Sequence, residues 1–228
     1  MANYCTTKLV FEGEKAELDE FEAMLRRLES MKEEEFPLET SWGSRWLGFI
    51  VHELGENWEE YNCKGVWYDL VRRDDNSLAL TTESAWSICD DILNLITDKW
   101  PSLNYLYYAD EPGCEFYETN DSEGKYFPER YYLHGFIPAK DENDEVTFLE
   151  VDEYFNTEQE VLAFVGDTLH HPVESLDDIA AWSEEIEALN DEHEDDENWE
   201  EWCYISVNKI EVVYTFDVSL FDDIEPIV

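Results

Sequence analysis

The chain opens with a β-type run of side chains and continues with a helical one. Residues 6–12 are rich in β-branched and aromatic side chains and stop at Gly13, which predicts a strand followed by a turn. From residue 15 to residue 31, large apolar side chains recur every three or four positions, as on one face of an amphipathic helix. This stripe consists of Leu18, Phe21, Leu25 and Leu28. A β-α unit is therefore expected first.

A hairpin and a second helix are predicted next. Residues 65–71 and 78–82 are two β-rich runs joined by a polar turn sequence, which is typical of a hairpin. Ser87 and Asp90 have the spacing of a capping box and predict the start of a helix that ends before Pro101. One side of this helix carries Ile88, Ile92, Leu95 and Ile96.

Two more strands complete the N-terminal pattern. Residues 103–109 and 114–119 are strand-like, whereas residues 32–64 show no clear period and are interpreted as an insertion with a short helix. The resulting order, β-α-β-β-α-β, predicts an α+β protein with a ferredoxin-like core. We expect a core domain at residues 1–140, with the insertion at about 32–64, and a second region at residues 141–228.

The second region is expected to be an acidic extension of two helices and one or two strands. Thr157 with Glu160 and Ser175 with Asp178 have capping-box spacing, so each pair predicts a helix start. The two apolar stripes are Val161, Leu162, Val165 and Leu169, then Ile179, Trp182, Ile186 and Leu189. Residues 146–151 predict a strand. In residues 203–217 the apolar positions change phase near Asn208 and Lys209, which predicts a bulge or a tight hairpin there.

Charge is the strongest functional clue in the sequence. The chain has a net charge of −44 from 58 acidic and 14 basic residues, and Lys209 is the one basic residue after position 140. Such a field repels nucleic acid and anionic membranes and attracts basic protein surfaces and cations. The aromatic content of 15% is high for a disordered chain, so a folded and very acidic protein is expected.

The cysteines and the N-terminus favour a cytoplasmic protein. The five cysteines are scattered and never spaced CxxC, which predicts free, buried thiols in a reducing compartment rather than disulfides or a zinc site. The N-terminal residues lack the features of a signal peptide, and no run of about 18 apolar residues is present to span a membrane.

No catalytic or metal-binding motif stands out. The sequence has no GxSxG, Walker, GxGxxG or HExxH pattern, and residues 141–145 lack the glycine of an EF-hand loop. With 58 acidic residues, some close carboxylate pair is expected by chance. We therefore expect no enzyme, no catalytic residue, no dedicated metal site and no cofactor. An enzyme or small-ligand binder is retained as an alternative.

The tryptophans are assigned to two roles. Packing in the core is the expected role of Trp42, Trp46, Trp58, Trp67, Trp86 and Trp100, because such rings dominate burial in a small domain. Trp199 and Trp202 lie among acidic residues and are expected to anchor that segment or to contact a partner.

Four short segments resemble the YubB-type ferredoxin-like domain family of plasmid and phage proteins. They are MANYC at residues 1–5, Asn57-Trp58 leading to GVWYD at 65–69, TESAWS at 82–87 and ADEPG at 109–113. The resemblance covers roughly residues 1–136 and implies a ferredoxin-like fold and a mobile-element origin. The family has no established activity, so the resemblance implies no site residues.

The preferred function is a non-enzymatic acidic protein that mimics DNA and occupies a basic nucleic-acid-binding host protein of the restriction, CRISPR or repressor type. The alternative is an acidity that serves solubility alone. The candidate binding face combines the helix after Ser175 with residues 191–202, where eight carboxylates lie. It consists of Asp177, Asp178, Glu184, Glu185, Glu187, Asp191, Glu192, Glu194, Asp195, Asp196, Glu197, Trp199, Glu200 and Glu201.

Overall fold

The structure is a computed structural model that describes residues 3–140, 146–192 and 203–213. Within these residues the protein is α+β, with five α-helices, a six-stranded mixed sheet and a three-stranded antiparallel sheet. Backbone contacts divide the chain into unit 1, residues 1–127 with 212–228, and unit 2, residues 128–211. Unit 2 is therefore inserted into the sequence of unit 1.

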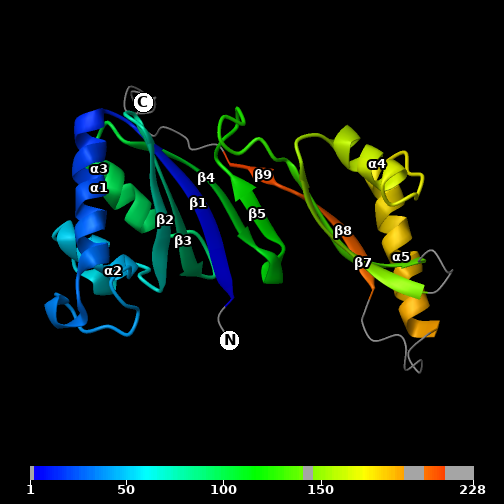
Figure 1. Cartoon of the computed structure of the whole chain (residues 1–228), viewed down its shortest axis with the longest axis horizontal. Coiled ribbons are helices and arrows are strands. Elements are labelled where there is room, and N and C mark those ends of the chain that lie inside the picture. The colour runs from blue at the N-terminus through cyan, green and yellow to red at the C-terminus, as the bar shows by residue number, and fades with distance from the viewer. Residues whose placement is uncertain (1–2, 141–145, 193–202, 214–228) are drawn as a thin grey trace, which may run out of the picture. The chain divides into compact units, whose positions relative to one another are not determined.

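Unit 1 is built on the six-stranded sheet (Figure 1). Its central strand β1 pairs antiparallel with β3 on one side and with β4 on the other. The strand order is β2-β3-β1-β4-β5-β9. The strands are β1 (Tyr4–Glu12), β2 (Gly65–Asp74), β3 (Ser77–Ala85), β4 (Asn104–Glu111), β5 (Phe116–Thr119) and β9 (Glu211–Val212).

Three helices cover one face of this sheet and enclose the core of unit 1. They are α1 (Lys15–Ser30), α2 (Leu47–Glu53) and α3 (Asp90–Lys99), which Figure 1 shows beside β2 and β3. The whole predicted stripe of α1 is buried. Trp67 of β2 and Phe11 of β1 are fully buried against the helices because alternate strand residues point to the same face. The predicted β-α start, the hairpin and the two following strands are confirmed.

The predicted insertion contributes to the core rather than lying outside it. Within residues 32–64 the structure has α2 and two 3-10 turns, η1 (Glu33–Glu35) and η2 (Trp58–Glu60). A third such turn, η3 (Pro112–Cys114), joins β4 to β5. Phe49 and Val51 of α2 are fully buried in the core of unit 1. The expected short helix is confirmed.

Strand β2 contains a bulge. Its pairing with β3 shifts between Tyr68 and Val71, so that Asp69 and Leu70 share one position opposite β3. Asp69 has a φ of 53°, in the left-handed region. The extra residue lets Leu70 face the core while Tyr68 and Val71 face the opposite side of the sheet.

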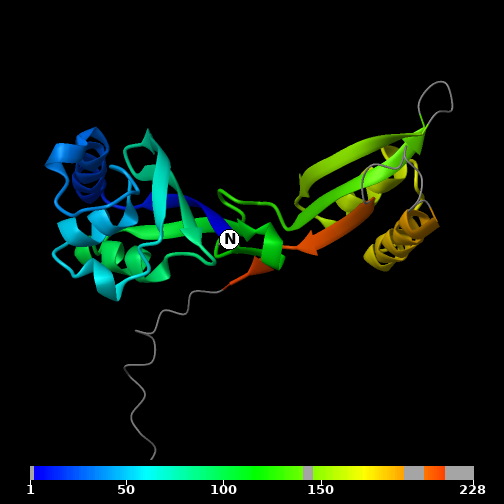
Figure 2. The ribbon, with the colours of Figure 1, turned by 90° about the horizontal axis from the view of Figure 1, so that it is seen from below.

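Unit 2 is a three-stranded sheet covered on one face by two helices (Figures 1 and 2). Its strand order is β7-β6-β8. Its elements are β6 (Tyr131–Lys140), β7 (Val146–Phe155), α4 (Glu158–Asp167), α5 (Leu176–Glu192) and β8 (Tyr204–Lys209). The predicted capping box of Thr157 and Glu160 is present at the start of α4. Leu133, Val151 and Ile205 from the sheet pack with Val161, Val165 and Ile186 from the helices.

The central strand β6, whose sequence contains a glycine and a proline, was not predicted. Gly135 allows β8 to approach closely, since a Cβ there would lie 2.6 Å from the carbonyl oxygen of Tyr204. Pro138 lies beyond residues 131–136, the part of β6 that pairs with β8, so among the described strands it pairs with β7 alone. Because β6 pairs with β7 and β8, the division between the units lies at residues 127 and 128, and not at residue 140 as expected.

Two local predictions are wrong. Helix α3 begins at Asp90 after Cys89 and has no side-chain cap, while the Ser87 hydroxyl donates to the carbonyl of Ile88. The long final strand is neither bulged nor a hairpin. Strand β8 ends at Lys209, Ile210 is buried, and β9 then belongs to the other sheet. The phase change in the sequence thus marks the passage from one sheet to another.

Candidate functional site

Helix α5 begins with a reciprocal cap. The backbone N–H groups of Glu174 and Ser175 donate to Asp178 Oδ2 at 2.8 and 2.9 Å, and the Asp178 N–H donates to Ser175 Oγ at 3.3 Å. The bond from the Glu174 N–H, with those from Ser175, holds the pKa of Asp178 below its usual value. The predicted pairing of Ser175 with Asp178 is confirmed, and Asp178 is a capping residue.

The inner face of α5 is held by a narrow apolar stripe and one amide. Ile179 and Ile186 are buried, and Trp182 stacks on His171 with ring centroids 4.0 Å apart. Leu189, expected in the stripe, is 37% exposed. The buried Asn190 side chain accepts from the Cys203 N–H and donates to the Cys203 carbonyl. These contacts fix which side of α5 faces away from the sheet.

The outer side of α5 is acidic. Five acidic residues of α5 have side chains that the structure describes, and all five are exposed: Asp177, Asp178, Glu184, Glu185 and Glu187. With 3.6 residues per turn, they lie within about 90° of the direction opposite to Ile179 and Ile186. Apart from Asp178, none of them forms a hydrogen bond or ion pair with any residue that the structure describes. We call these five residues the α5 acidic face.

The remaining predicted binding residues are placed only in part. Asp191 and Glu192 are the last two residues of α5. In the sequence they form a third acidic pair, seven residues after the pair 184–185, which itself lies seven residues after the pair 177–178. Seven further residues lie outside the described residues: Glu194, Asp195, Asp196, Glu197, Trp199, Glu200 and Glu201. Trp202 also lies outside them.

On unit 1, the acidic residues of one surface region are paired with arginines. An alternating network runs along α1, in which Arg72 lies 3.1 Å from Asp19 and 3.7 Å from Glu22. Arg26 lies 3.3 Å from Glu22 and 3.5 Å from Glu29, and Arg45 lies 2.6 Å from Glu29. Each charge in this network has a neighbour of opposite sign, so this part of the surface presents less net field than its count of acids suggests.

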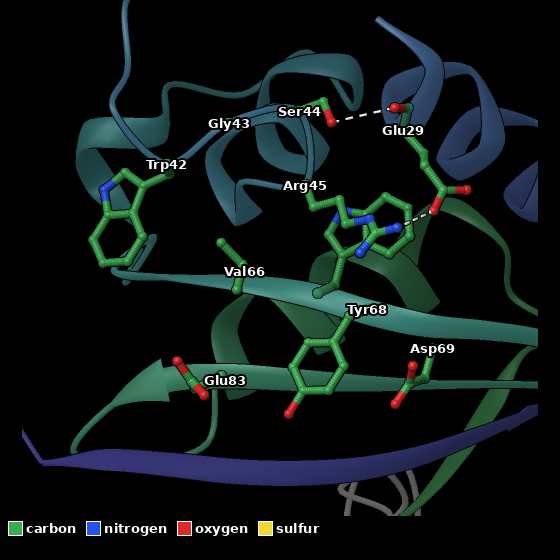
Figure 3. Close-up of a pocket in the computed structure, with 10 residues that line it drawn as sticks. Glu29, Trp42, Gly43, Ser44, Arg45, Val66, Tyr68, Asp69 and Glu83 are labelled. Atoms are coloured by element: carbon green, nitrogen blue, oxygen red, sulfur yellow. Dashed lines mark hydrogen bonds and ion pairs between the residues drawn. The ribbon is translucent and has the colours of Figure 1, made fainter.

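A hollow of about 690 Å³ lies on unit 1 between the loop at residues 42–45 and strands β2 and β3 (Figure 3). This hollow was not predicted, because Trp42 was assigned to the core, whereas Trp42 is 39% exposed. Trp86 is 55% exposed, which also contradicts a core position. Trp46, Trp67 and Trp100 are buried as expected, and Trp58 is partly buried.

The nucleophile-type side chains of unit 1 are not activated. Burial raises the pKa of Cys5 to about 11 and those of Cys63 and Cys89 to about 12. These thiols are therefore protonated at neutral pH and poor nucleophiles. Cysteines are free thiols throughout, as expected, although Cys114 is exposed rather than buried. Among residues 3–140, 146–192 and 203–213, no three His, Cys, Asp or Glu side chains are grouped to hold a metal.

Comparison with known proteins identifies no relative: no family model, no curated protein and no solved structure matches the chain. In the described part of the chain, no helix has both the length and the apolar character needed to cross a bilayer.

Proposed function

We propose that this protein acts by binding, without catalysis, and that the α5 acidic face occupies the DNA-binding surface of a basic protein. The observation that carries the proposal is the exposure of five carboxylates on one side of α5 without a basic partner among the described residues. Carboxylates in this state keep their charge available to an external cation, whereas paired ones do not.

The spacing of these charges supports mimicry of DNA. The α5 acidic face spans eleven residues, so at a rise of 1.5 Å per residue it places one charge about every 3 Å along the helix axis. One strand of duplex DNA carries a charge about every 3.4 Å of axis. A protein surface that binds DNA through lysine and arginine side chains therefore meets a comparable linear charge on α5.

The fold assignment adds indirect support. Unit 1 has helices between β1 and β2 and between β3 and β4, and these four strands are in the order β2-β3-β1-β4. This arrangement favours a ferredoxin-like core extended by β5 and β9. Membership of the YubB-type family, and with it a plasmid or phage origin, remains part of the proposal. Such an origin fits a target among restriction, CRISPR or repressor proteins of the host.

Displacement of DNA tests the proposal. Fluorescently labelled duplex bound to a panel of basic host DNA-binding proteins is titrated with this protein at 50 and 200 mM salt. We expect displacement from at least one panel member, with an apparent affinity that falls about tenfold or more over this salt range. A lack of displacement from every member at 50 mM salt would instead support an acidity that serves solubility.

Matched variants locate the contact. The triple variant Glu184→Gln, Glu185→Gln, Glu187→Gln should weaken displacement about tenfold or more. The control neutralises three exposed acids of unit 1, Glu34, Glu56 and Glu59, and should change it less than about twofold. A third variant neutralises Asp195, Asp196 and Glu197, and should have less effect than the α5 variant. The reverse ranking would assign the contact to residues 191–202.

A further inference from the structure

The hollow on unit 1 is a built feature of the fold rather than a loose surface loop. The loop at residues 42–45, which forms one wall, is attached to β2 by backbone pairing. The Trp67 N–H donates to the Arg45 carbonyl at 3.0 Å, and Trp46 and Val66 form an antiparallel β-bridge. The Ser44 hydroxyl donates to the Glu29 carbonyl of α1 at 3.2 Å. Residues from the loop, α1, β2 and β3 are thereby held around one space (Figure 3).

Aromatic rings form much of the wall. Trp42 is 39% exposed, and Tyr68 from β2 is half-buried. Trp67 also lines the hollow and is fully buried, and its indole Nε1 has no hydrogen-bond partner. The exposed indole of Trp42 is available for stacking, and indole is the side-chain ring that attracts cations most strongly.

The charge of the hollow is negative after internal pairing. Glu29 is neutralised by Arg26 and Arg45. Asp69 and Glu83 line the same space and have no ion-pair or hydrogen-bond partner among the residues described. Figure 3 shows Glu83 and Asp69 near Tyr68, on the side of the hollow away from Trp42 and the loop. The site therefore has two carboxylates left for a ligand.

Two observations on Tyr68 and Asp69 agree with a negatively charged binding site in the hollow. Burial is the largest cause of the raised pKa of the Tyr68 hydroxyl, and the nearby carboxylates of Glu83, Asp69 and Asp110 raise that pKa further. Asp69 occupies the bulge with a φ of 53°. A bulge redirects a side chain, and left-handed backbone at a residue other than glycine is often associated with a binding or catalytic role.

We propose that this hollow binds an organic cation, an alkyl chain ending in a guanidinium or ammonium group, which stacks on Trp42 and pairs with Asp69 and Glu83. Two carboxylates beside aromatic rings suit such a group, because the rings cover its apolar part and face while the carboxylates accept its N–H bonds. Calcium would require six to eight oxygen ligands, which two carboxylates do not supply. The site lies on unit 1 and is independent of the α5 acidic face.

Titration with argininamide in 0.15 M NaCl, followed by the indole N–H signals in ¹H–¹⁵N NMR spectra, tests the proposal. The Trp42 signal is identified by its loss in Trp42→Phe. We expect saturable movement of this signal with a Kd on the order of 1 mM, as for a ligand of this size. The neutral analogue citrullinamide should bind about tenfold more weakly, because it lacks the charge.

Variants distinguish binding at the hollow from non-specific attraction of a cation to a protein with a net charge of −44. The double variant Asp69→Asn, Glu83→Gln should weaken argininamide binding about tenfold, and Trp42→Ala about threefold or more. The control Glu59→Gln, Asp98→Asn removes the same charge from exposed positions elsewhere on unit 1 and should change the Kd less than twofold. Equal weakening by the control, or equal binding of citrullinamide, would overturn the proposal.

Further ligands distinguish the source of the cation. Spermidine represents free polyamines, and acetyl-Gly-Arg-Gly-amide represents an arginine side chain of a polypeptide. Tighter binding of the peptide than of argininamide and spermidine, by about tenfold, would identify a protein ligand. Equal or tighter binding of the small cations would identify a free metabolite. Loss of this site in Asp69→Asn, Glu83→Gln should leave DNA displacement by the α5 acidic face unchanged, so the two proposals fail separately.

Discussion

Helix α1 contains five acidic residues, and α5 contains five whose side chains the structure describes. Among the described residues, other parts of the protein pair the carboxylates of α1 but not those of α5. On α1, Asp19, Glu22 and Glu29 have arginine partners. Glu17 accepts from the N–H and hydroxyl of Ser102, and Glu20 accepts from the Trp100 indole. On α5, Asp178 caps its own helix and the other four have no partner among the described residues. Acidic composition alone therefore does not distinguish structural carboxylates from those available to a ligand.

The largest expected effect comes from removing the arginine at the centre of the α1 network. Arg72 is 19% exposed, pairs with Asp19 and Glu22 and donates to the carbonyls of Asp74 and Asp75. Arg72→Gln should lower the free energy of unfolding by about 2 kcal/mol and Tm by about 4–8 °C, because Asp19 and the partly buried Glu22 each lose one arginine partner and the carbonyls of Asp74 and Asp75 lose their donor.

Thermal unfolding followed by circular dichroism measures this loss. The matched control is Arg73→Gln, which makes the same charge change at the exposed neighbouring residue. Arg73 stacks over Tyr126, so its loss should remain under about 1 kcal/mol. Equal losses would show that the network contributes nothing beyond net charge.

A pH-dependent effect is expected at Glu12. Burial would raise the pKa of Glu12, but hydrogen bonds from Lys125 and Tyr126 outweigh it and lower the pKa. Because the folded pKa is lower than the unfolded one, the stabilisation is present above the unfolded pKa of about 4.3 and is lost as the pH falls through the folded value.

Glu12→Gln should therefore lower Tm by about 2–4 °C at pH 7 and by progressively less below about pH 4. Tm measured from pH 3 to pH 8 tests this. Glu185→Gln on α5, which lacks such partners, should produce no comparable loss at any pH. A constant gap between Glu12→Gln and the wild type across the range would contradict the pairing.

The smallest expected effect is a gain in stability on α5. The triple variant Glu184→Gln, Glu185→Gln, Glu187→Gln should raise Tm by about 1–2 °C in 20 mM salt, because like charges at neighbouring helix positions repel one another. The gain should vanish near 0.5 M salt, where the Debye length is short. The equivalent change on α1, Glu17→Gln, Glu20→Gln, Glu22→Gln, should lower Tm. A fall in Tm for the α5 variant would reveal an intramolecular partner.

Local sequence patterns were sufficient to predict features that depend on residues close together within one helix. The stripe of α1 and the capping box at Thr157 and Glu160 depend on residues within four positions of one another, and both are confirmed. The capping box at Ser87 and Asp90 was wrong because the Ser84 hydroxyl donates to the Ser87 carbonyl, which holds Ser87 outside the helix. Tertiary contacts there outweigh the local pattern.

Features that depend on distant segments could not be read from the sequence. Strand β6 tolerates Gly135 because of the approach of β8 from a remote part of the chain. The hollow on unit 1 combines residues from α1, the loop at 42–45, β2 and β3, each unremarkable alone. The α5 acidic face was anticipated from the spacing of its apolar residues, but the lack of basic partners depends on which residues surround it in the fold.

The pairing of β9 with β5 gives the chain a defined order of assembly during synthesis. Strands β1 to β5 can associate as soon as they are made, but Val213 donates to the Thr119 carbonyl only after all of unit 2 has been translated. Until then β5 is the last strand of its sheet and exposes unpaired backbone groups, which is a risk for aggregation. Rapid folding of unit 2 would shorten the loop that must close before β9 can pair with β5. Completion of the six-stranded sheet of unit 1 in a nascent chain therefore depends on unit 2.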